Sequence, residues 1–216
     1  MGALQRLCSA AVGALAASGA GVSVMAEDGA RGVAAASDPT SEQIEELQFV
    51  LGEGPCIDAF ESRRPVLVPD LADEAANRWP AYTPAAQDEG VRAVFAFPLQ
   101  VGGARLGVLD VFRARAGPLS GDHLRQAFTF TDLAVKTLID GQDHAIGGAA
   151  ADGLDEAIEH SPELFQAQGM VMVQLGVSLA EALVRIRAHT YAENLRLNDV
   201  ARDIVARRLR LDPDYS

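Results

Sequence analysis

Residues 161–209 read SPELFQAQGMVMVQLGVSLAEALVRIRAHTYAENLRLNDVARDIVARRL, and they contain three short helical patterns with almost no loop between them. Apolar positions recur every three or four residues in each pattern, as they do along one face of a helix. The residues that share this spacing are Leu164, Ala167, Val171 and Leu175, then Ala182, Leu183, Ile186 and Thr190, then Val200, Ala201, Ile204, Val205 and Leu209. Three helices that each bury one face predict a small helical bundle.

Local signals indicate where these helices begin and end. Ser161 is an N-cap residue followed by a proline, and Ser178 stands three positions before a glutamate in the spacing of a capping box. Together with the apolar spacing, these signals predict helices over residues 161–175, 178–194 and about 198–209.

The order of short motifs in this stretch is similar to that of a known family. Gln-Ala-Gln-Gly-Met at 166–170, Glu-Ala at 181–182, Arg187, and Asn-Leu-Arg-Leu-Asn-Asp-Val-Ala at 194–201 occur in sequence. The stretch resembles the ANTAR domain, a three-helix RNA-binding module of transcription antiterminators. The resemblance implies that the partner is RNA, in the form of hairpin-containing leader transcripts.

The resemblance also implies which side chains contact RNA. The candidates are Gln168, Gly169, Arg187, Asn194, Arg196, Asn198, Arg202, Arg207 and Arg208. Many ANTAR domains have a basic residue where Gln168 and Asn198 stand, so we expect weaker attraction to the RNA backbone here. The alternative interpretation is that the arginines form a solvated helical face and pair with neighbouring carboxylates.

The preceding part of the chain alternates between helical and strand patterns, which predicts an α+β fold with an antiparallel sheet flanked by helices. We expect strands at 21–26, 31–36, 65–68, 91–99 and 105–112, a turn at 27–29, and helices at 2–18, 41–50, 56–62, 79–89 and 119–140. The last helix is expected to bury Leu124, Phe128, Thr131, Val135 and Leu138.

Four segments of this part are similar to a second family. LGEGPCIDA at 51–59, PVLVPDL at 65–71, and the strands 94–99 and 106–112 resemble a GAF domain, in particular the one that precedes ANTAR in actinobacterial regulators. GAF domains are sensors that hold a small ligand between the sheet and its crossover segments. We therefore expect a GAF sensor domain at 1–140, a flexible glycine-rich linker at 141–160 and an ANTAR domain at 161–211.

The resemblance places a ligand pocket near Cys56, Trp79, Tyr82, Phe95 and Phe97, although aromatic residues in a small α+β domain are also ordinary core residues. Cys56 follows Gly-Glu-Gly-Pro and is expected to pack in the core, with a redox or ligand-attachment role as the alternative. The cyclic-nucleotide motif of some GAF domains is absent from the sequence.

The sequence shows no metal-ligand spacing and no catalytic set. The four histidines are scattered, and the carboxylates Asp58, Glu61 and Asp70 near the expected pocket are not paired as acid and base. We therefore expect no metal, no cofactor and no enzymatic activity.

Charge is distributed unevenly along the chain. The net charge is −12, and residues 161–216 contain seven acidic and seven basic groups, so the net acidity belongs to the first 160 residues. With two cysteines, no long apolar span and a weak apolar N-terminus, we expect a cytoplasmic protein without a membrane segment.

Taken together, these features predict a signal-responsive RNA-binding antiterminator. The resemblance implies a homodimer, and the amphipathic helices 2–18 and 119–140 are the expected interface. Two alternatives stay open: a GAF-type thiol-dependent methionine sulfoxide reductase, and a regulatory bundle that binds protein or DNA.

Overall fold

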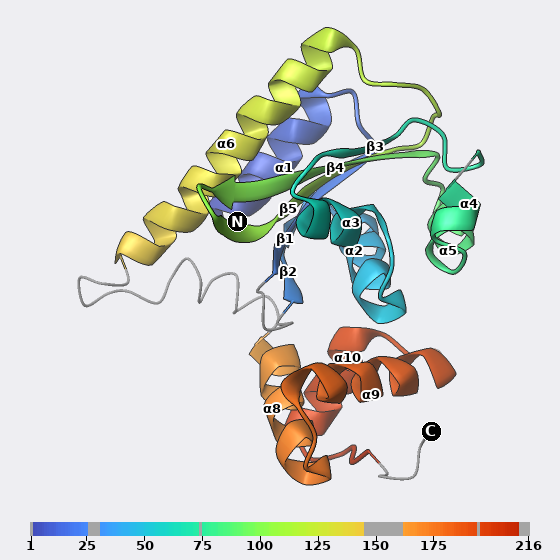
Figure 1. The fold of residues 1–216 in the computed structure, drawn as a ribbon, viewed down its shortest axis with the longest axis vertical. Helices are drawn as coiled ribbons and strands as arrows, with labels where there is room; N and C mark the ends of the chain where they lie inside the picture. The colour runs from blue at the N-terminus through green and yellow to red at the C-terminus, as the bar shows by residue number, and fades with distance from the viewer. Residues whose placement is uncertain (1, 26–30, 74, 145–161, 194, 212–216) are drawn as a thin grey trace.

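The computed structural model describes residues 2–25, 31–73, 75–144, 162–193 and 195–211. Its N-terminal part is built on a five-stranded antiparallel sheet with strand order β2-β1-β5-β4-β3 (Figure 1). The strands are β1 (Gly19–Met25), β2 (Arg31–Ala36), β3 (Val66–Val68), β4 (Ala93–Val101) and β5 (Ala104–Arg113). The α+β class predicted from the sequence is confirmed.

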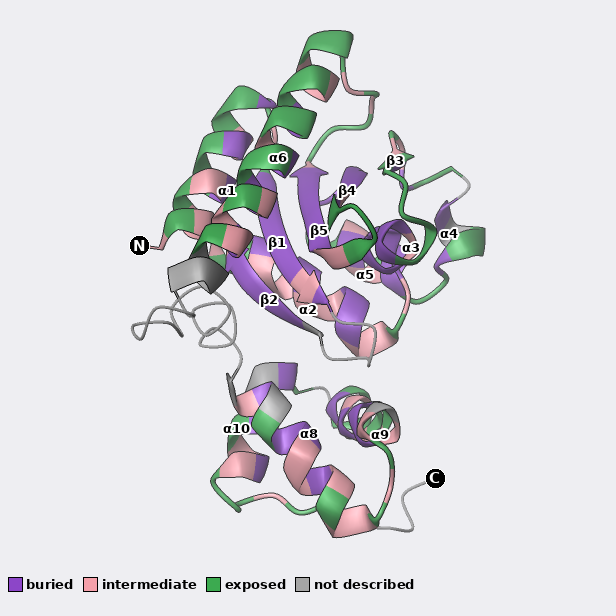
Figure 2. Ribbon diagram, turned by 60° about the vertical axis from the view of Figure 1, so that its left-hand side comes forward, coloured by how far each residue is buried: buried purple, intermediate pink, exposed green. Residues whose placement is uncertain are grey.

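Helices cover both faces of this sheet. On one face, α1 (Ala3–Ala14) and the long α6 (Gly121–His144) lie side by side. On the other face lie α2 (Pro39–Leu51) and α3 (Pro55–Ser62), and α5 (Tyr82–Asp88) packs against α2 and follows the short α4 (Ala75–Arg78). The sheet is therefore the middle layer of three, and Figure 2 shows β1 and much of β5 as buried.

Side-chain alternation along β4 divides the core into two halves. Phe95, Phe97 and Leu99 pack with α1 and α6, whereas Val94 and Ala96 point to the opposite side, toward α2 and α3. All five are at most 1 % exposed. A strand buried on both faces is expected to be a continuous apolar run, as AVFAFPL at 93–99 is.

The C-terminal part is a bundle of three helices, α8 (Pro162–Leu175), α9 (Leu179–Ala192) and α10 (Leu197–Val205). Ser178 caps α9 by accepting a hydrogen bond from the backbone N–H of Glu181, as its spacing predicts. The apolar stripes pack together as expected; their fully buried members are Leu164, Ala167, Val171, Ala182, Leu183, Ile186, Thr190, Val200, Ala201 and Ile204.

Some expected boundaries differ from the structure. Helix α10 ends at Val205 and not near Leu209, because Arg207 adopts a left-handed conformation (φ 57°) that reverses the chain. Helix α1 ends at Ala14 and not at residue 18, because Ala16 is likewise left-handed (φ 48°). Helix α4 was not expected, and the expected turn at 27–29 lies outside the described residues.

Two further expectations concern α6 and the segment after it. Phe128 was expected in the core, yet its side chain is 45 % exposed and touches the buried Phe97 of β4 edge-on. Helix α6 continues to His144, into the expected linker, and residues 145–160 of that linker lie outside the described part of the chain. In the ranges that the structure describes, no helix combines the length and the apolar character needed to cross a membrane.

Gly107 in β5 tests how tightly the two central strands pack. A Cβ at this position would overlap the backbone carbonyl oxygen of Ser23 in β1, which cannot move without breaking the ladder. We predict that Gly107→Ala lowers the free energy of unfolding by about 2–3 kcal/mol, since overpacking against backbone is not relieved by a rotamer change. Urea unfolding followed by the fluorescence of Trp79, the single tryptophan, measures this.

Gly103 in the turn of the same hairpin is the matched control. A Cβ there has no atom within 4 Å, so Gly103→Ala should change the free energy of unfolding by less than about 0.5 kcal/mol. If Gly107→Ala and Gly103→Ala lowered the free energy of unfolding equally, close packing of β5 against β1 would not explain the effect at Gly107.

Candidate functional site

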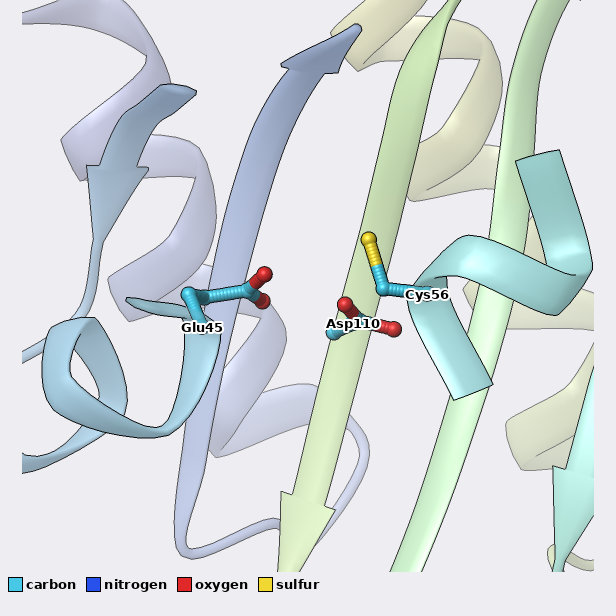
Figure 3. Close-up of side chains that lie close together, drawn as sticks. All are labelled: Glu45, Cys56 and Asp110. Carbon is cyan, nitrogen blue, oxygen red and sulfur yellow. The ribbon is translucent and has the colours of Figure 1, made fainter. Parts of the chain in front are cut away.

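Two carboxylates and a thiol meet in the core of the N-terminal domain. Glu45 comes from α2, Cys56 from the first turn of α3, and Asp110 from the middle of β5 (Figure 3). A potential ligand atom of each residue lies within 4.8 Å of those of the other two, and all three residues are fully buried. Gly21 in β1 makes room for this arrangement, because a Cβ there would overlap the Glu45 carboxylate.

Each carboxylate is held through one of its oxygens. Ser23 Oγ donates to Glu45 Oε2 over 2.6 Å, and Gln48 Nε2 donates to Asp110 Oδ2 over 3.2 Å. Gln48 Oε1 accepts from the backbone N–H of Cys56 over 2.7 Å, so one amide orients both residues. The second oxygens, Glu45 Oε1 and Asp110 Oδ1, have no hydrogen-bond partner among the described residues.

Burial dominates the acid–base properties of this cluster. It raises the pKa of Glu45 well above the usual range, and the negative charge of Asp110 raises it further. Burial also raises the pKa of Asp110. The pKa of Tyr82 is raised well above its usual value by burial and then by the charges of Asp110, Glu45 and Cys56. These shifts describe a core that disfavours negative charge.

The expected ligand pocket is divided by the sheet. Cys56, Trp79 and Tyr82 lie together on the side of α2 and α3, as the resemblance implies. Phe95 and Phe97 were expected with them, but both pack with α1 and α6 on the opposite face, so their assignment to this pocket is wrong. The sequence indicates that alternate residues of β4 point to opposite faces of the sheet. It does not indicate which set, Phe95 and Phe97 or Val94 and Ala96, faces Cys56.

Sequence reasoning missed Glu45 and Asp110 and considered other acids instead. Of those, Asp58 is ion-paired with Arg78 over 2.7 Å, away from the cluster. Asp110 interrupts the apolar run LGVLDVF of a strand, and Glu45 stands on the buried stripe of an amphipathic helix. A charged residue at an inward position of either element is a usable signal, because such residues are rarely buried without a function or a partner.

In the C-terminal bundle, Gln168 does not lie where an RNA contact requires it. Its side chain is fully buried in the bundle, and neither amide atom has a hydrogen-bond partner among the described residues. In this conformation the amide does not reach solvent. The resemblance to the ANTAR domain made Gln168 an RNA-contact candidate through its place in the Ala-x-Gly-Met segment, yet Gln168 shares the inward side of α8 with Leu164, Ala167 and Val171.

Two other candidates line one groove. Gly169 in α8 and Arg207 after α10 border a concavity of about 870 Å³. Met170, Val173 and Ile204 contribute apolar surface to it, and Gln166, Gln174 and Arg210 contribute polar groups. Arg210 was not among the residues expected from the sequence. We call this concavity the α8–α10 groove.

Arg202 in α10 and Arg208 in the segment after it have acidic neighbours. Arg202 pairs with Asp199 over 2.9 Å and Arg208 with Asp203 over 2.6 Å, and all four side chains are exposed or half-exposed. The Arg208–Asp203 pair agrees with the alternative interpretation of a solvated, ion-paired face. Exposed pairs of this kind contribute little to stability and leave the arginines available to other anions.

Arg187 joins the two parts of the molecule. Its Nε donates to the backbone carbonyl of Val50 at the end of α2 over 2.7 Å. Its guanidinium group occupies the space that a Cβ at Gly52 would need, and Gly52 ends α2 in a left-handed conformation (φ 72°). Helix α9 packs against α2 around this contact. Arg187 therefore contacts protein where RNA was expected.

Arg196 lies beside the same junction. It lines a cleft of about 970 Å³ together with Tyr191 and Leu195, and the opposite wall belongs to α2 and α5. That wall includes Glu46, Asp88 and Glu89. The placement of Asn194 lies outside the described residues; Asn198 is in α10, and its side chain is likewise outside the description.

Comparison with protein families matches both parts of the chain. The GAF domain model matches residues 2–139, and the ANTAR domain model matches residues 152–205. No curated protein matches the chain.

Solved structures resemble the N-terminal part. One is a domain assigned to a two-component sensor histidine kinase protein from Sinorhizobium meliloti 1021, with 22 % identity and a TM-score of 0.52 over 62 % of this chain and 88 % of that one. Another is the GAF domain of an Acinetobacter phosphoenolpyruvate-protein phosphotransferase, with 14 % identity and a TM-score of 0.51 over 67 % and 84 %. At these identities the likeness concerns the fold.

The burial of Gln168 leads to a prediction. Gln168→Met replaces an amide without partners by an apolar side chain of similar length, so we expect the free energy of unfolding of the C-terminal bundle to rise by about 1–2 kcal/mol. Urea unfolding followed by far-ultraviolet circular dichroism measures it. Destabilisation by the substitution would mean that the amide has a partner in solution.

Proposed function

Since the chain belongs to the GAF domain family and its C-terminal helices match the ANTAR domain, we propose that it is a signal-responsive RNA-binding transcription antiterminator. The GAF domain would sense a ligand, and the ANTAR domain would bind leader RNA that contains two hairpins in tandem. Such a protein acts on nascent transcripts and would work in the cytoplasm. The observation that carries the proposal is the α8–α10 groove.

The chemistry of this groove suits an RNA loop. Arg207 and Arg210 can contact phosphates, and the exposed Gln166 side chain offers a donor and an acceptor to base edges. Gln174 Nε2 donates to the backbone carbonyl of Leu211 over 2.5 Å, which leaves its amide oxygen as an acceptor. Met170 and Val173 provide an apolar surface for an unstacked base. Unpaired loop bases are readable by side chains in this way, whereas the deep groove of an A-form duplex is not.

The charge distribution also favours the C-terminal bundle as the RNA-binding part of the molecule. The last 56 residues are neutral, while the first 160 residues have the whole net charge of −12. A polyanion is therefore repelled least at the C-terminal bundle. The α8–α10 groove lies in this neutral bundle and contains Arg207 and Arg210, which are not part of the Arg202–Asp199 and Arg208–Asp203 ion pairs.

The thiol-reductase alternative is disfavoured by the positions of the two cysteines. Cys56 packs on the α2 and α3 side of the sheet, and Cys8 packs on the α1 and α6 side. Burial raises the pKa of Cys8 to about 12, which disfavours its reactive thiolate. Within one chain, Cys56 therefore has no second cysteine on its own side of the sheet with which to form a disulfide.

We propose that the contact between α9 and α2 links the two domains functionally. Arg187 is held by α2, and Arg196 faces a wall with three acidic residues, so two RNA-contact candidates are withheld from a polyanion in this arrangement. A ligand in the GAF domain that moved α2 would release them. Dimerisation through α1 and α6 remains part of the proposal, supported by the half-exposed Phe128 and Leu133 on α6.

The groove leads to a binding prediction. The double variant Arg207→Gln/Arg210→Gln should bind a tandem-hairpin leader RNA about tenfold more weakly, and the slope of log K against log salt should fall by roughly one to two, because two phosphate contacts are lost. Fluorescence anisotropy at several salt concentrations measures both quantities. The RNA is chosen by crosslinking the protein in cells and sequencing the RNA or DNA that is recovered.

The control removes positive charge elsewhere. Arg115 is exposed in the GAF domain, so Arg115→Gln lowers the charge without touching the bundle and should leave affinity and slope nearly unchanged. Recovery of DNA or only protein from cells, or no RNA binding by the full chain, would reject the antiterminator proposal in favour of the alternatives.

The domain contact leads to a second prediction. Gly52→Ala places a Cβ where the Arg187 guanidinium lies, and should separate the domains without altering any residue of the bundle. We expect RNA affinity to rise severalfold, because Arg187 is released from α2 and the acidic wall moves away from the exposed Arg196. The same anisotropy titration measures it.

Gly90 supplies the matched control for backbone strain. It also has a positive φ (84°), but a Cβ there meets no atom within 4 Å. Gly90→Ala therefore introduces similar strain in the GAF domain without touching Arg187, and should not change RNA affinity. A loss of affinity in Gly52→Ala would show that the docked arrangement is the one that binds RNA.

A further inference from the structure

The buried cluster of Glu45, Cys56 and Asp110 brings together two carboxyl groups and a thiol, all of which can act as metal ligands. The neutral residues Ser23 and Gln48 each donate a hydrogen bond to one carboxylate, and Asp110 also makes side-chain hydrogen-bonding contacts with Glu45 and Cys56. Two buried carboxyl groups side by side are unfavourable unless a proton or a cation lies between them. The cluster therefore requires a positive partner.

One oxygen of each carboxylate is fixed by a neutral donor, and a proton between Glu45 and Asp110 can satisfy the pair when no cation is bound. Glu45 Oε1 and Asp110 Oδ1 accept no hydrogen bond from an N–H group or a hydroxyl of the described residues. The Tyr82 hydroxyl is a third buried polar atom without a described partner, and the charges of Asp110, Glu45 and Cys56 all act on it. The buried cluster therefore has oxygen atoms to which a ligand could bind.

We propose that Glu45, Cys56 and Asp110 form a binding site for one divalent transition-metal ion of the Zn²⁺ class in the core of the GAF domain. The ligand atoms lie within 4.8 Å of one another, so side-chain shifts of the order of 1 Å would bring all three to about 2.0–2.3 Å from a single ion. A thiolate favours zinc and similar ions over Mg²⁺ and Ca²⁺, which take oxygen ligands alone.

The neighbours of the three ligands fit such a site. Gln48 fixes the backbone N–H of Cys56 and one oxygen of Asp110, and Ser23 fixes one oxygen of Glu45, so every ligand is oriented by a second residue. Three protein ligands leave a fourth position open on a tetrahedral ion. Tyr82 Oη can hydrogen-bond a water or small ligand in that position, and Met25 Sδ lies 3.8 Å from the Cys56 thiol.

The test uses the full chain freed of metal with a chelator and titrated with Co²⁺, a spectroscopic substitute for Zn²⁺. We expect one ion per chain and a thiolate-to-cobalt charge-transfer absorption in the near ultraviolet. Competition with a chromophoric chelator then gives the Zn²⁺ affinity. A spectrum without the thiolate band would assign the metal to the histidines or surface acids and overturn the proposal, as would the absence of stoichiometric binding.

Variants separate the site from the remaining chain. Cys56→Ser should abolish the charge-transfer band and weaken Zn²⁺ binding by at least about 100-fold, and Gln48→Leu should weaken it about 10–100-fold through the lost orientation of two ligands. Cys8→Ser is the matched control, because Cys8 is equally buried but lies on the other face of the sheet. An unchanged band in Cys56→Ser would reject the site.

Glu45→Gln distinguishes the loss of a metal ligand from misfolding as the cause of weaker metal binding. It keeps the shape of the side chain and removes a buried acid, so the metal-free variant should have a higher melting temperature than the metal-free parent. Metal affinity should fall at the same time. A lower melting temperature together with unchanged metal affinity would contradict the proposal. All of these measurements are made without RNA, so their outcome is independent of the proposed antiterminator function.

Discussion

The burial of the central sheet on both faces is the constraint on which the arrangement of the GAF domain depends. Strands β4 and β5 lie between two helical layers, so each buried side chain along them must suit one core or the other. The layer of α1 and α6 receives the large aromatic residues Phe95 and Phe97. The layer of α2 and α3 receives smaller side chains from β4 and, in β5, a carboxylate. The polar cluster is thus confined to one of two otherwise apolar cores.

Much of this could be predicted from local sequence. Period-two alternation indicated the strands, capping residues such as Ser178 indicated helix starts, and periodic apolar positions indicated the bundle. These features succeed because they are determined within a few residues of chain. Helix ends failed at Ala16 and Arg207, where non-glycine residues adopt left-handed conformations that propensity does not anticipate.

Non-local features were beyond such reasoning. The cluster joins residues 45, 56 and 110, and the Arg187–Val50 hydrogen bond spans 137 positions, so neither is visible in any short window. Gln168 shows a different failure: family resemblance placed a polar residue on the binding face, and burial in the bundle removed it. Position in a motif predicts where a residue stands on a helix, but packing decides whether it is accessible.

Helix α2 has one further property. Its inward side contributes Glu45 to the polar cluster, and its last turn contributes the Val50 carbonyl that holds Arg187 of the ANTAR domain. One helix therefore contacts both the polar cluster in the sensor core and the domain junction. Thermodynamic linkage makes such a connection reciprocal. To the extent that occupancy of the core shifts α2 and changes RNA affinity, bound RNA must change the affinity of the core for its ligand by the same factor. The transcript would then be an effector of the sensor as much as its target.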